Sequence, residues 1–145
     1  MSAPPPSSGS LGWFRRSLLG LVGLIVAGLL GTAAMLTPNN QGLGTHQQLG
    51  LPPCSSRVWF GVRCPACGMT TSWAYLTKGN VVGSIRSNAA GFLLGLTAMA
   101  SAPWLLVTAF RGRPPLGYPN EIVALVVVCS IAAVMVAEWL FRVMS

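Results

Sequence analysis

Three long apolar runs constrain the fold of this chain more than any other feature. They extend from Ser17 to Leu36, from Ala89 to Phe110 and from Ile122 to Phe141. Glu138 is the one charged residue inside them. About 20 apolar residues in a helix cross a bilayer core of roughly 30 Å. We therefore predict an all-α integral membrane protein with three transmembrane helices, at 13–36, 88–110 and 122–142.

The composition agrees with a membrane location. Charged residues are 8% of the chain, against about 25% in an average globular domain. The chain has nine Lys and Arg residues and two acidic residues, which gives a net charge of +7. The basic residues stand singly or in pairs beside the apolar runs and form no stripe along one element, so lipid headgroups are the expected partner and nucleic acid is not.

Residues 1–12 are rich in Pro, Ser and Gly, which predicts a disordered tail. Trp13 to Arg16 follow as an interfacial anchor. The pair Arg15 and Arg16 slightly resembles a twin-arginine signal. However, the apolar run is longer than the 7–15 residues typical of a signal peptide, and no small-x-small cleavage site follows it. We expect this first helix to be a retained anchor.

Small residues recur on two of the predicted spans. Gly23, Ala27 and Gly31 share one face of the first span, and Gly91 and Gly95 form a GxxxG pair on the second. Small residues let helices approach closely in lipid. These faces are predicted to pack on each other, or on a protein partner or a second copy of the chain.

The connection at 37–87 is the long polar part of the chain. Apolar residues at positions 69, 73 and 76 follow a helical period, which predicts a short amphipathic helix at about 68–78 lying in the membrane interface. Asn88 is a suitable N-cap for the second span. A short basic loop at 111–121 joins the second span to the third.

Two further residues lie in the third apolar run. Cys129 is interpreted as a small buried hydrophobic residue without a chemical role. Glu138 stands four residues before Arg142, and we expect the two to pair at the end of the helix.

Three cysteines lie in the polar connection, and two of them belong to the segment Cys64-Pro65-Ala66-Cys67-Gly68. A helix is predicted directly after this turn. The free N–H groups and the positive dipole of a helix start favour a thiolate, the form of cysteine that binds metal or attacks a disulfide. With Cys54 the set is odd, so a disulfide leaves one thiol over and a metal needs a fourth ligand.

Three functions fit this set of residues. In the first, a disulfide or a metal staples the loop, and the protein has a structural, assembly or accessory role. In the second, Cys64 and Cys67 are the catalytic pair of a thiol–disulfide oxidoreductase, with Cys54 as a shuttle partner. In the third, zinc is bound by Cys54, Cys64, Cys67 and His46. The connection lacks carboxylates and has one His, which argues against hydrolases and against calcium or magnesium sites.

The motif resembles the domain-of-unknown-function 2752 family of small bacterial membrane proteins. The resemblance covers about 54–110 and consists of Cys54, the segment Gly61 to Thr70, Gly79-Asn80 and Ser87-Asn88. It implies a membrane location and a shared cysteine site, and it brings no known reaction. Three positions depart from the family pattern, with Thr71 in place of Arg, Asn80 in place of Asp and Ala89 in place of Pro.

The distribution of basic residues predicts the orientation. Arg15, Arg16, Arg111 and Arg113 lie close to ends of the predicted spans, which the positive-inside rule places in the cytoplasm. We therefore expect an integral protein of the cytoplasmic membrane with a cytoplasmic N-terminus and an outward cysteine loop.

Overall fold

The computed structural model describes residues 11–39, 44–52, 54–61 and 64–144, and these form helices and their connections, with no strand among them. The elements in chain order are α1 (Trp13–Met35), the 3-10 helix η1 (Thr45–Leu49), α2 (Ser55–Phe60), α3 (Met69–Thr77), α4 (Val81–Ser87), α5 (Ala89–Arg111) and α6 (Glu121–Met144). The predicted all-α fold class is confirmed. The predicted disordered tail falls mostly on residues 1–10, outside the described part.

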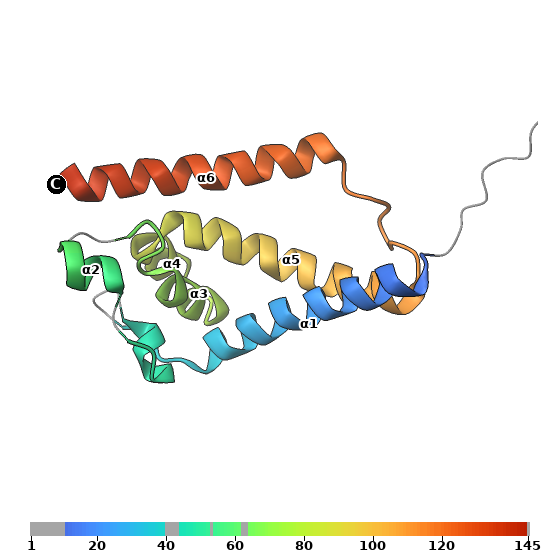
Figure 1. The fold of residues 1–145 in the computed structure, drawn as a ribbon, viewed down its shortest axis with the longest axis horizontal. Coiled ribbons are helices and arrows are strands. Elements are labelled where there is room, and N and C mark those ends of the chain that lie inside the picture. Colours follow the sequence, from blue (N-terminus) through green and yellow to red (C-terminus); the bar gives the residue numbers. More distant parts are fainter. Residues whose placement is uncertain (1–10, 40–43, 53, 62–63, 145) are drawn as a thin grey trace, which may run out of the picture.

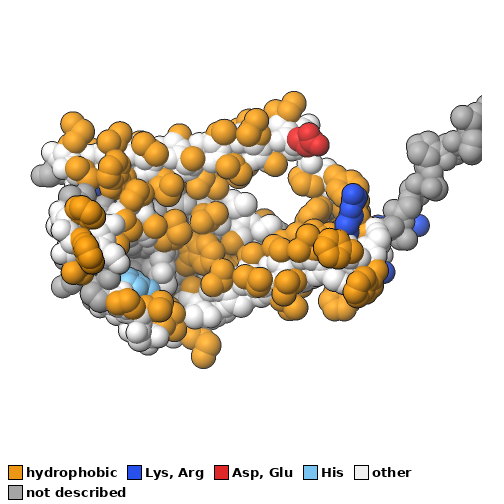
Figure 2. All heavy atoms as spheres, viewed as in Figure 1, with side chains coloured by type: hydrophobic (Ala, Val, Ile, Leu, Met, Phe, Trp, Pro, Cys, Tyr) orange, Lys and Arg blue, Asp and Glu red, His pale blue; other side chains and the backbone are white. Residues whose placement is uncertain are grey.

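Helices α1, α5 and α6 occupy the three apolar runs and are long and apolar enough to cross a membrane. They lie lengthwise in the molecule, and the short helices α2, α3 and α4 gather at one end, where α1 and α6 end and α5 begins (Figure 1). Hydrophobic side chains cover most of the visible face of the long helices (Figure 2). These features indicate a membrane protein.

The polar connection contains more helix than its sequence suggests. Elements η1 and α2 lie where turn-forming residues and the absence of a clear period predict irregular chain. The hydroxyl groups of Thr45 in η1 and Thr71 in α3 hydrogen-bond at 2.7 Å, and both residues are buried. Since η1 packs on α3 in this way, tertiary contacts explain a helix that its own residues do not favour.

Helix α1 packs along α5 through small residues, as predicted. However, Gly23 packs against Leu105 and Leu106 rather than against the glycine pair of α5. A Cβ at Gly23 would lie 3.0 Å from Leu106 and 3.2 Å from Leu105, and one at Gly31 would meet nothing within 4 Å. The contact therefore uses the N-terminal half of the predicted stripe.

The predicted pairing of the α5 glycines with α1 is wrong, because Gly91 and Gly95 face α3. A Cβ at Gly91 would lie 3.2 Å from the Cα of Met69, and one at Gly95 would lie 2.6 Å from Leu76 Cδ2. Gly23, Gly91 and Gly95 are buried within the chain, so their faces are covered before any second copy or partner binds.

Helix α6 contacts α5 and has no buried residue. The interpretation of Cys129 as a buried residue is therefore wrong, because its side chain is exposed on α6. The predicted pair of Glu138 and Arg142 is confirmed as an ion pair.

Basic side chains cap the C-terminal ends of two long helices by hydrogen bonding to their carbonyls. Arg16 donates from Nε to the Ala109 carbonyl at 2.9 Å and from Nη2 to the Phe110 carbonyl at 2.7 Å, at the end of α5. Lys78 donates from Nζ to the Leu36 carbonyl at 2.7 Å, just after α1. A cation is stabilised at a helix C-terminus by the unpaired carbonyls and the helix dipole.

Candidate metal or thiol site

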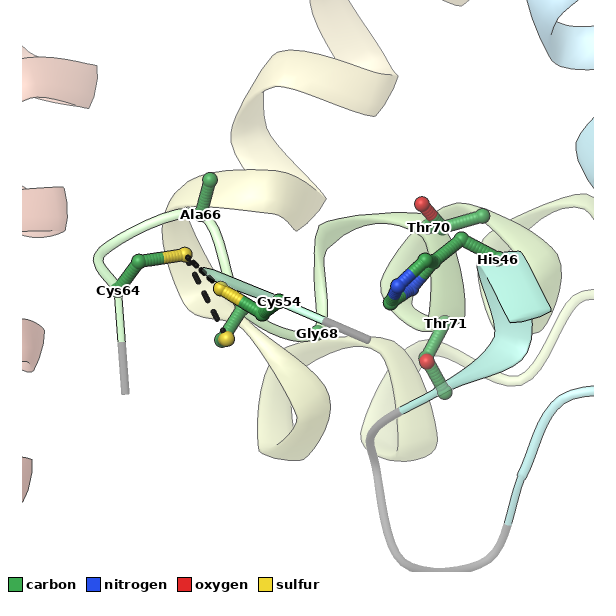
Figure 3. A pocket seen from close by; sticks show the side chains of 8 residues that line it. His46, Cys54, Cys64, Ala66, Gly68, Thr70 and Thr71 are labelled. Carbon is green, nitrogen blue, oxygen red and sulfur yellow. Dashed lines mark hydrogen bonds between the residues drawn. The ribbon is translucent and has the colours of Figure 1, made fainter. Parts of the chain in front are cut away.

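The three cysteines of the polar connection come together at the end of the molecule that carries the short helices. Cys54 is the residue before α2, and Cys64 and Cys67 lie in the turn before α3. The Sγ atom of Cys64 is 3.4 Å from that of Cys54 and 3.5 Å from that of Cys67 (Figure 3). All three sulfurs lie within 4.8 Å of one another.

The sulfur distances do not correspond to a disulfide. None of the four cysteines forms a disulfide in the structure. A disulfide holds its sulfurs at about 2.05 Å, well below the 3.4 Å between Cys54 and Cys64. The expected disulfide staple is therefore not seen here.

The turn that presents Cys64 and Cys67 is a tight one. The Cys67 N–H donates to the Cys64 carbonyl at 3.0 Å, and the Met69 N–H donates to the Ala66 carbonyl at 3.1 Å. Gly68 then adopts φ +89° as the N-cap of α3. Glycine takes this left-handed conformation without steric cost, which lets the chain turn directly from Cys67 into the helix.

Asn88 holds this turn from the start of α5. Its side-chain Nδ2 donates to the carbonyls of Pro65 and Cys67, each at 3.1 Å. Its Oδ1 accepts from the Gly91 N–H at 2.5 Å, so the predicted N-cap is confirmed. The side chain is fully buried. One amide therefore caps α5 and fixes the position of the cysteine turn.

Buried hydroxyl groups reinforce this support. The hydroxyls of Ser72 in α3 and Ser84 in α4 lie 2.8 Å apart, Ser84 donates to the Ser72 carbonyl, and Ser72 lies within hydrogen-bond distance of the Asn88 carbonyl. No buried side-chain N or O atom among the described residues lacks a hydrogen-bond partner. The short helices are thus joined to the start of α5 by a satisfied polar network, which favours a single arrangement.

Burial changes the chemistry expected of Cys67. Burial of the side chain, followed by its side-chain hydrogen bonds with Cys64 and Cys54, raises the pKa of Cys67 from 9.0 to about 12. The helix start was expected to favour a thiolate at this turn. For Cys67, loss of contact with water outweighs that effect, because burial disfavours the charged form.

His46 lies near the cysteines but does not join them. It lines a cavity of about 210 Å³ together with the three cysteines, Thr70 and Thr71. In Figure 3 its imidazole lies beside the two threonines and apart from the sulfurs. Its ring nitrogens are not part of the group of close ligand atoms. The structure brings together three of the four predicted zinc ligands.

A larger apolar cavity of about 520 Å³ adjoins this one. It lies between α1, η1, α3 and α5, and its lining includes Leu36, Met69 and Trp73. His46, Ala66 and Thr70 line both cavities. The cysteine cavity is therefore bordered by apolar surface contributed by a long helix.

The sequence analysis named Asn88 and Arg142 but did not predict that either residue contacts the cysteine turn. Asn88 was recognised as a cap, but nothing in its own sequence neighbourhood indicates that it holds the cysteine turn. Arg142 donates from Nη1 to the Cys67 carbonyl at 3.4 Å, across 75 positions in the sequence. The spacing from Glu138 predicts the ion pair and carries no signal for the contact with Cys67.

Comparison with known proteins agrees with the predicted resemblance. Residues 54–102 match the family described as protein of unknown function (DUF2752). The match begins at Cys54 and includes the cysteine turn, α3, α4 and the first half of α5. The resemblance predicted from the motif is confirmed over this segment.

No curated protein and no solved structure matches the chain. Within the matched segment, Thr71 stands where the resemblance leads us to expect Arg. Its side chain is buried and bonded to Thr45. This position joins α3 to η1 and places no positive charge beside the sulfurs.

Proposed function

We propose that this chain is a membrane protein with a structural or accessory role, in which Cys54, Cys64 and Cys67 bind one zinc ion. The supporting observation is the approach of three sulfurs to within 4.8 Å of one another. The ion would join the start of α2 to the turn before α3. It would thereby staple the polar connection against the ends of the long helices.

The distances between the sulfurs favour an ion over a covalent bond. Zn–S bonds of about 2.3 Å in a tetrahedral site place two sulfur ligands about 3.8 Å apart. The separations of 3.4 Å between Cys54 and Cys64 and 3.5 Å between Cys64 and Cys67 are close to this value. Small side-chain movements are therefore enough to surround an ion. Binding would release the thiol protons, because a thiolate is the ligand form.

The fourth ligand is proposed to be His46. It lines the cavity onto which the three sulfurs open, and neutral imidazole is a usual zinc ligand. Its ring must move toward the sulfurs to reach the ion. A His46→Ala variant is expected to bind zinc more weakly. Equal affinity would assign the fourth position to water or to an external ligand.

The proposal is tested by metal analysis of protein purified in detergent under reducing conditions. We expect about one zinc per chain, and with Co²⁺ the absorption bands of thiolate-to-cobalt charge transfer. Serine at Cys54, Cys64 or Cys67 should weaken binding at least tenfold, because each removes a ligand. Cys129→Ser is the matched control, since this cysteine is exposed on α6. Absence of bound metal, with no binding on addition of Zn²⁺ or Co²⁺, would refute the proposal.

The central position of Cys64 supports a second candidate, thiol–disulfide exchange. Its sulfur lies within 3.5 Å of both other sulfurs, so either Cys54 or Cys67 can resolve a mixed disulfide formed by Cys64. Trapping a partner therefore requires serine at both Cys54 and Cys67. A disulfide-linked partner on that double variant, lost when Cys64 is also changed, supports exchange. Failure to trap under mild oxidation argues against it.

We propose further that the protein lies in the cytoplasmic membrane with its cysteine cluster outward. Helix α1 begins and α5 ends at the end opposite the short helices (Figure 1). The basic residues at or next to these two helix ends are Arg15, Arg16, Arg111 and Arg113. This end has the short loop between α5 and α6, and basic residues in short loops tend to stay in the cytoplasm.

A further inference from the structure

The last two turns of α6 contact the cysteine turn through a polar pair. Arg142 donates from Nη2 to the Ser87 carbonyl at 2.9 Å and from Nη1 to the Cys67 carbonyl at 3.4 Å. It also forms the ion pair with Glu138. The guanidinium thus binds the end of α4, the cysteine turn and its own helix at once.

Glu138 fixes the same helix against the start of α5. Its Oε2 accepts from the Ala89 N–H at 2.9 Å and from the Ala90 N–H at 3.5 Å. These are unpaired donors of the first helical turn, where a carboxylate is also favoured by the dipole.

The pair is not a solvent-exposed surface salt bridge. The side chains of Arg142 and Glu138 are 20% and 19% exposed. A partly buried ion pair whose remaining donors and acceptors are also bonded is costly to break, since one charge is then left unpaired. The two residues therefore set the register of α6 against α5 and the cysteine turn.

We propose that Arg142, oriented by Glu138, is a positioning residue of the cysteine centre. The inference rests on the proposed zinc function. Zn²⁺ with three thiolates has a net charge of −1, which a cation bonded to the Cys67 backbone stabilises. Arg142 and Asn88 both donate to the Cys67 carbonyl, so this ligand is held from two helices. Loss of such outer contacts typically weakens metal binding 10–100-fold.

The test compares zinc affinity, by competition with a chromophoric chelator, for the full chain and three variants. Arg142→Gln is expected to weaken binding 10–100-fold and to change the Co²⁺ charge-transfer spectrum, with helicity and monodispersity preserved. Arg142→Lys is also expected to bind more weakly, because an ammonium on one stem does not reproduce the planar fork between the two carbonyls. Arg86→Gln, at an exposed position in the last turn of α4, is the charge-matched control and should change affinity less than threefold.

The outcomes separate this inference from the proposed function. If the unaltered chain binds zinc and folded Arg142→Gln binds it equally well, the positioning role is overturned and the metal site stands. If Arg142→Lys retains full affinity, charge alone acts and the positioning role is likewise overturned. If Arg142→Gln does not fold, Glu138→Gln replaces it and must weaken zinc binding by at least tenfold.

A measurement that does not depend on metal tests the positioning role if the unaltered chain binds no zinc. In metal-free protein, loss of the contact with Arg142 should expose Cys67 and speed its alkylation relative to Cys54. If the unaltered chain binds no metal, this rate decides the positioning role alone, and an unchanged rate in Arg142→Gln overturns it.

Discussion

Asn88 shows how much a single buried amide decides in this protein. Its side-chain Nδ2 donates hydrogen bonds to the carbonyls of Pro65 and Cys67, and its Oδ1 accepts one from the Gly91 N–H. Because the Asn88 side chain is fully buried, its removal leaves the Gly91 N–H without its cap and takes one donor each from the Pro65 and Cys67 carbonyls.

We predict that Asn88→Ala destabilises the metal-free protein by roughly 2–4 kcal/mol. The estimate combines the lost cap, about 1 kcal/mol, with two carbonyls that lose a donor at about 1–3 kcal/mol for the pair. Thermal unfolding in detergent measures it. Asn120→Ala is the matched control, because Asn120 caps α6 at an exposed position through the Ile122 N–H. A loss no larger than that of the control would contradict the role assigned to Asn88.

The raised pKa of Cys67 leads to a prediction on reactivity. With the pKa at about 12, the thiol of the metal-free folded protein stays protonated through neutral and mildly basic pH. The thiolate is the form that reacts. Alkylation of Cys67 by iodoacetamide between pH 7 and 9 should therefore be slower in the folded chain than in the denatured chain, as followed by mass spectrometry. Equal rates would show that burial does not protect the thiol.

The same shift has a consequence for stability. The folded pKa lies above the unfolded value, so the folded state holds the proton more tightly. This contribution is fully present below about pH 9, near the ordinary pKa of the thiol. It is lost as the pH rises toward 12.

At the scale of elements, α3 connects the site to the rest of the chain. It begins directly after the cysteine turn and lies against α5 where Gly91 and Gly95 leave room. The indole Nε1 of Trp73 donates to the Gly91 carbonyl at 2.9 Å. The α5 glycines therefore set how closely the cysteine turn approaches Asn88.

We predict that Gly91→Leu moves α3 away from α5 and lowers both stability and zinc affinity. A Cβ at this position would be 3.2 Å from the backbone of Met69, which cannot move as a side-chain end can. Overpacking of this kind costs about 1–3 kcal/mol. Thermal unfolding and the zinc competition assay measure the two effects.

Gly31→Leu serves as the control for that substitution. It adds the same side chain to a long helix at a position where a Cβ meets nothing within 4 Å. Both measurements should remain near those of the unaltered chain. Similar losses in the two variants would contradict the assigned packing.

At the scale of the molecule, the long helices separate two ends with different contents. One end has the start of α1 and the loop between α5 and α6, and the other has the short helices (Figure 1). The cysteine cluster lies with the short helices, directly before α2 and α3. A helix of 23 residues is about 35 Å long, sufficient to place these ends on opposite sides of a bilayer.

We predict that the two ends differ in access to a membrane-impermeant maleimide. In a background with all four cysteines replaced by serine, a cysteine restored at position 64 should be labelled in intact cells. Tyr118→Cys, at an exposed site in the loop between α5 and α6, should be labelled only after permeabilisation. The reverse pattern would invert the proposed orientation, and labelling of both from outside would exclude a membrane between them.

Local features of the chain were sufficient to predict the three long helices and a helix start directly after the cysteine turn. An uncharged run of about 20 residues predicts a membrane helix because backbone groups must be satisfied internally in lipid. The caps at Asn88 and Asn120 and the pair of Glu138 with Arg142 depend on neighbours within four residues. Such short-range patterns are readable without a fold.

Contacts between distant residues were not readable in the same way. The GxxxG pair Gly91 and Gly95 predicts that another segment packs closely on this face but does not identify the segment. In the structure that segment is α3. The buried partner of Thr71 in η1, the raised pKa of Cys67 and the exposure of Cys129 depend on which surfaces cover each residue.

The sequence by itself determined that the chain is helical, apolar and equipped with three cysteines beside a membrane, because composition and period act locally. Only the tertiary structure decided that Cys54 joins Cys64 and Cys67, that His46 lies to the side, and that Arg142 reaches the cysteine turn. Contacts between residues far apart in the sequence depend on how the helices pack. That packing depends on all the contacting helix faces at once, so it cannot be predicted from one residue and its neighbours.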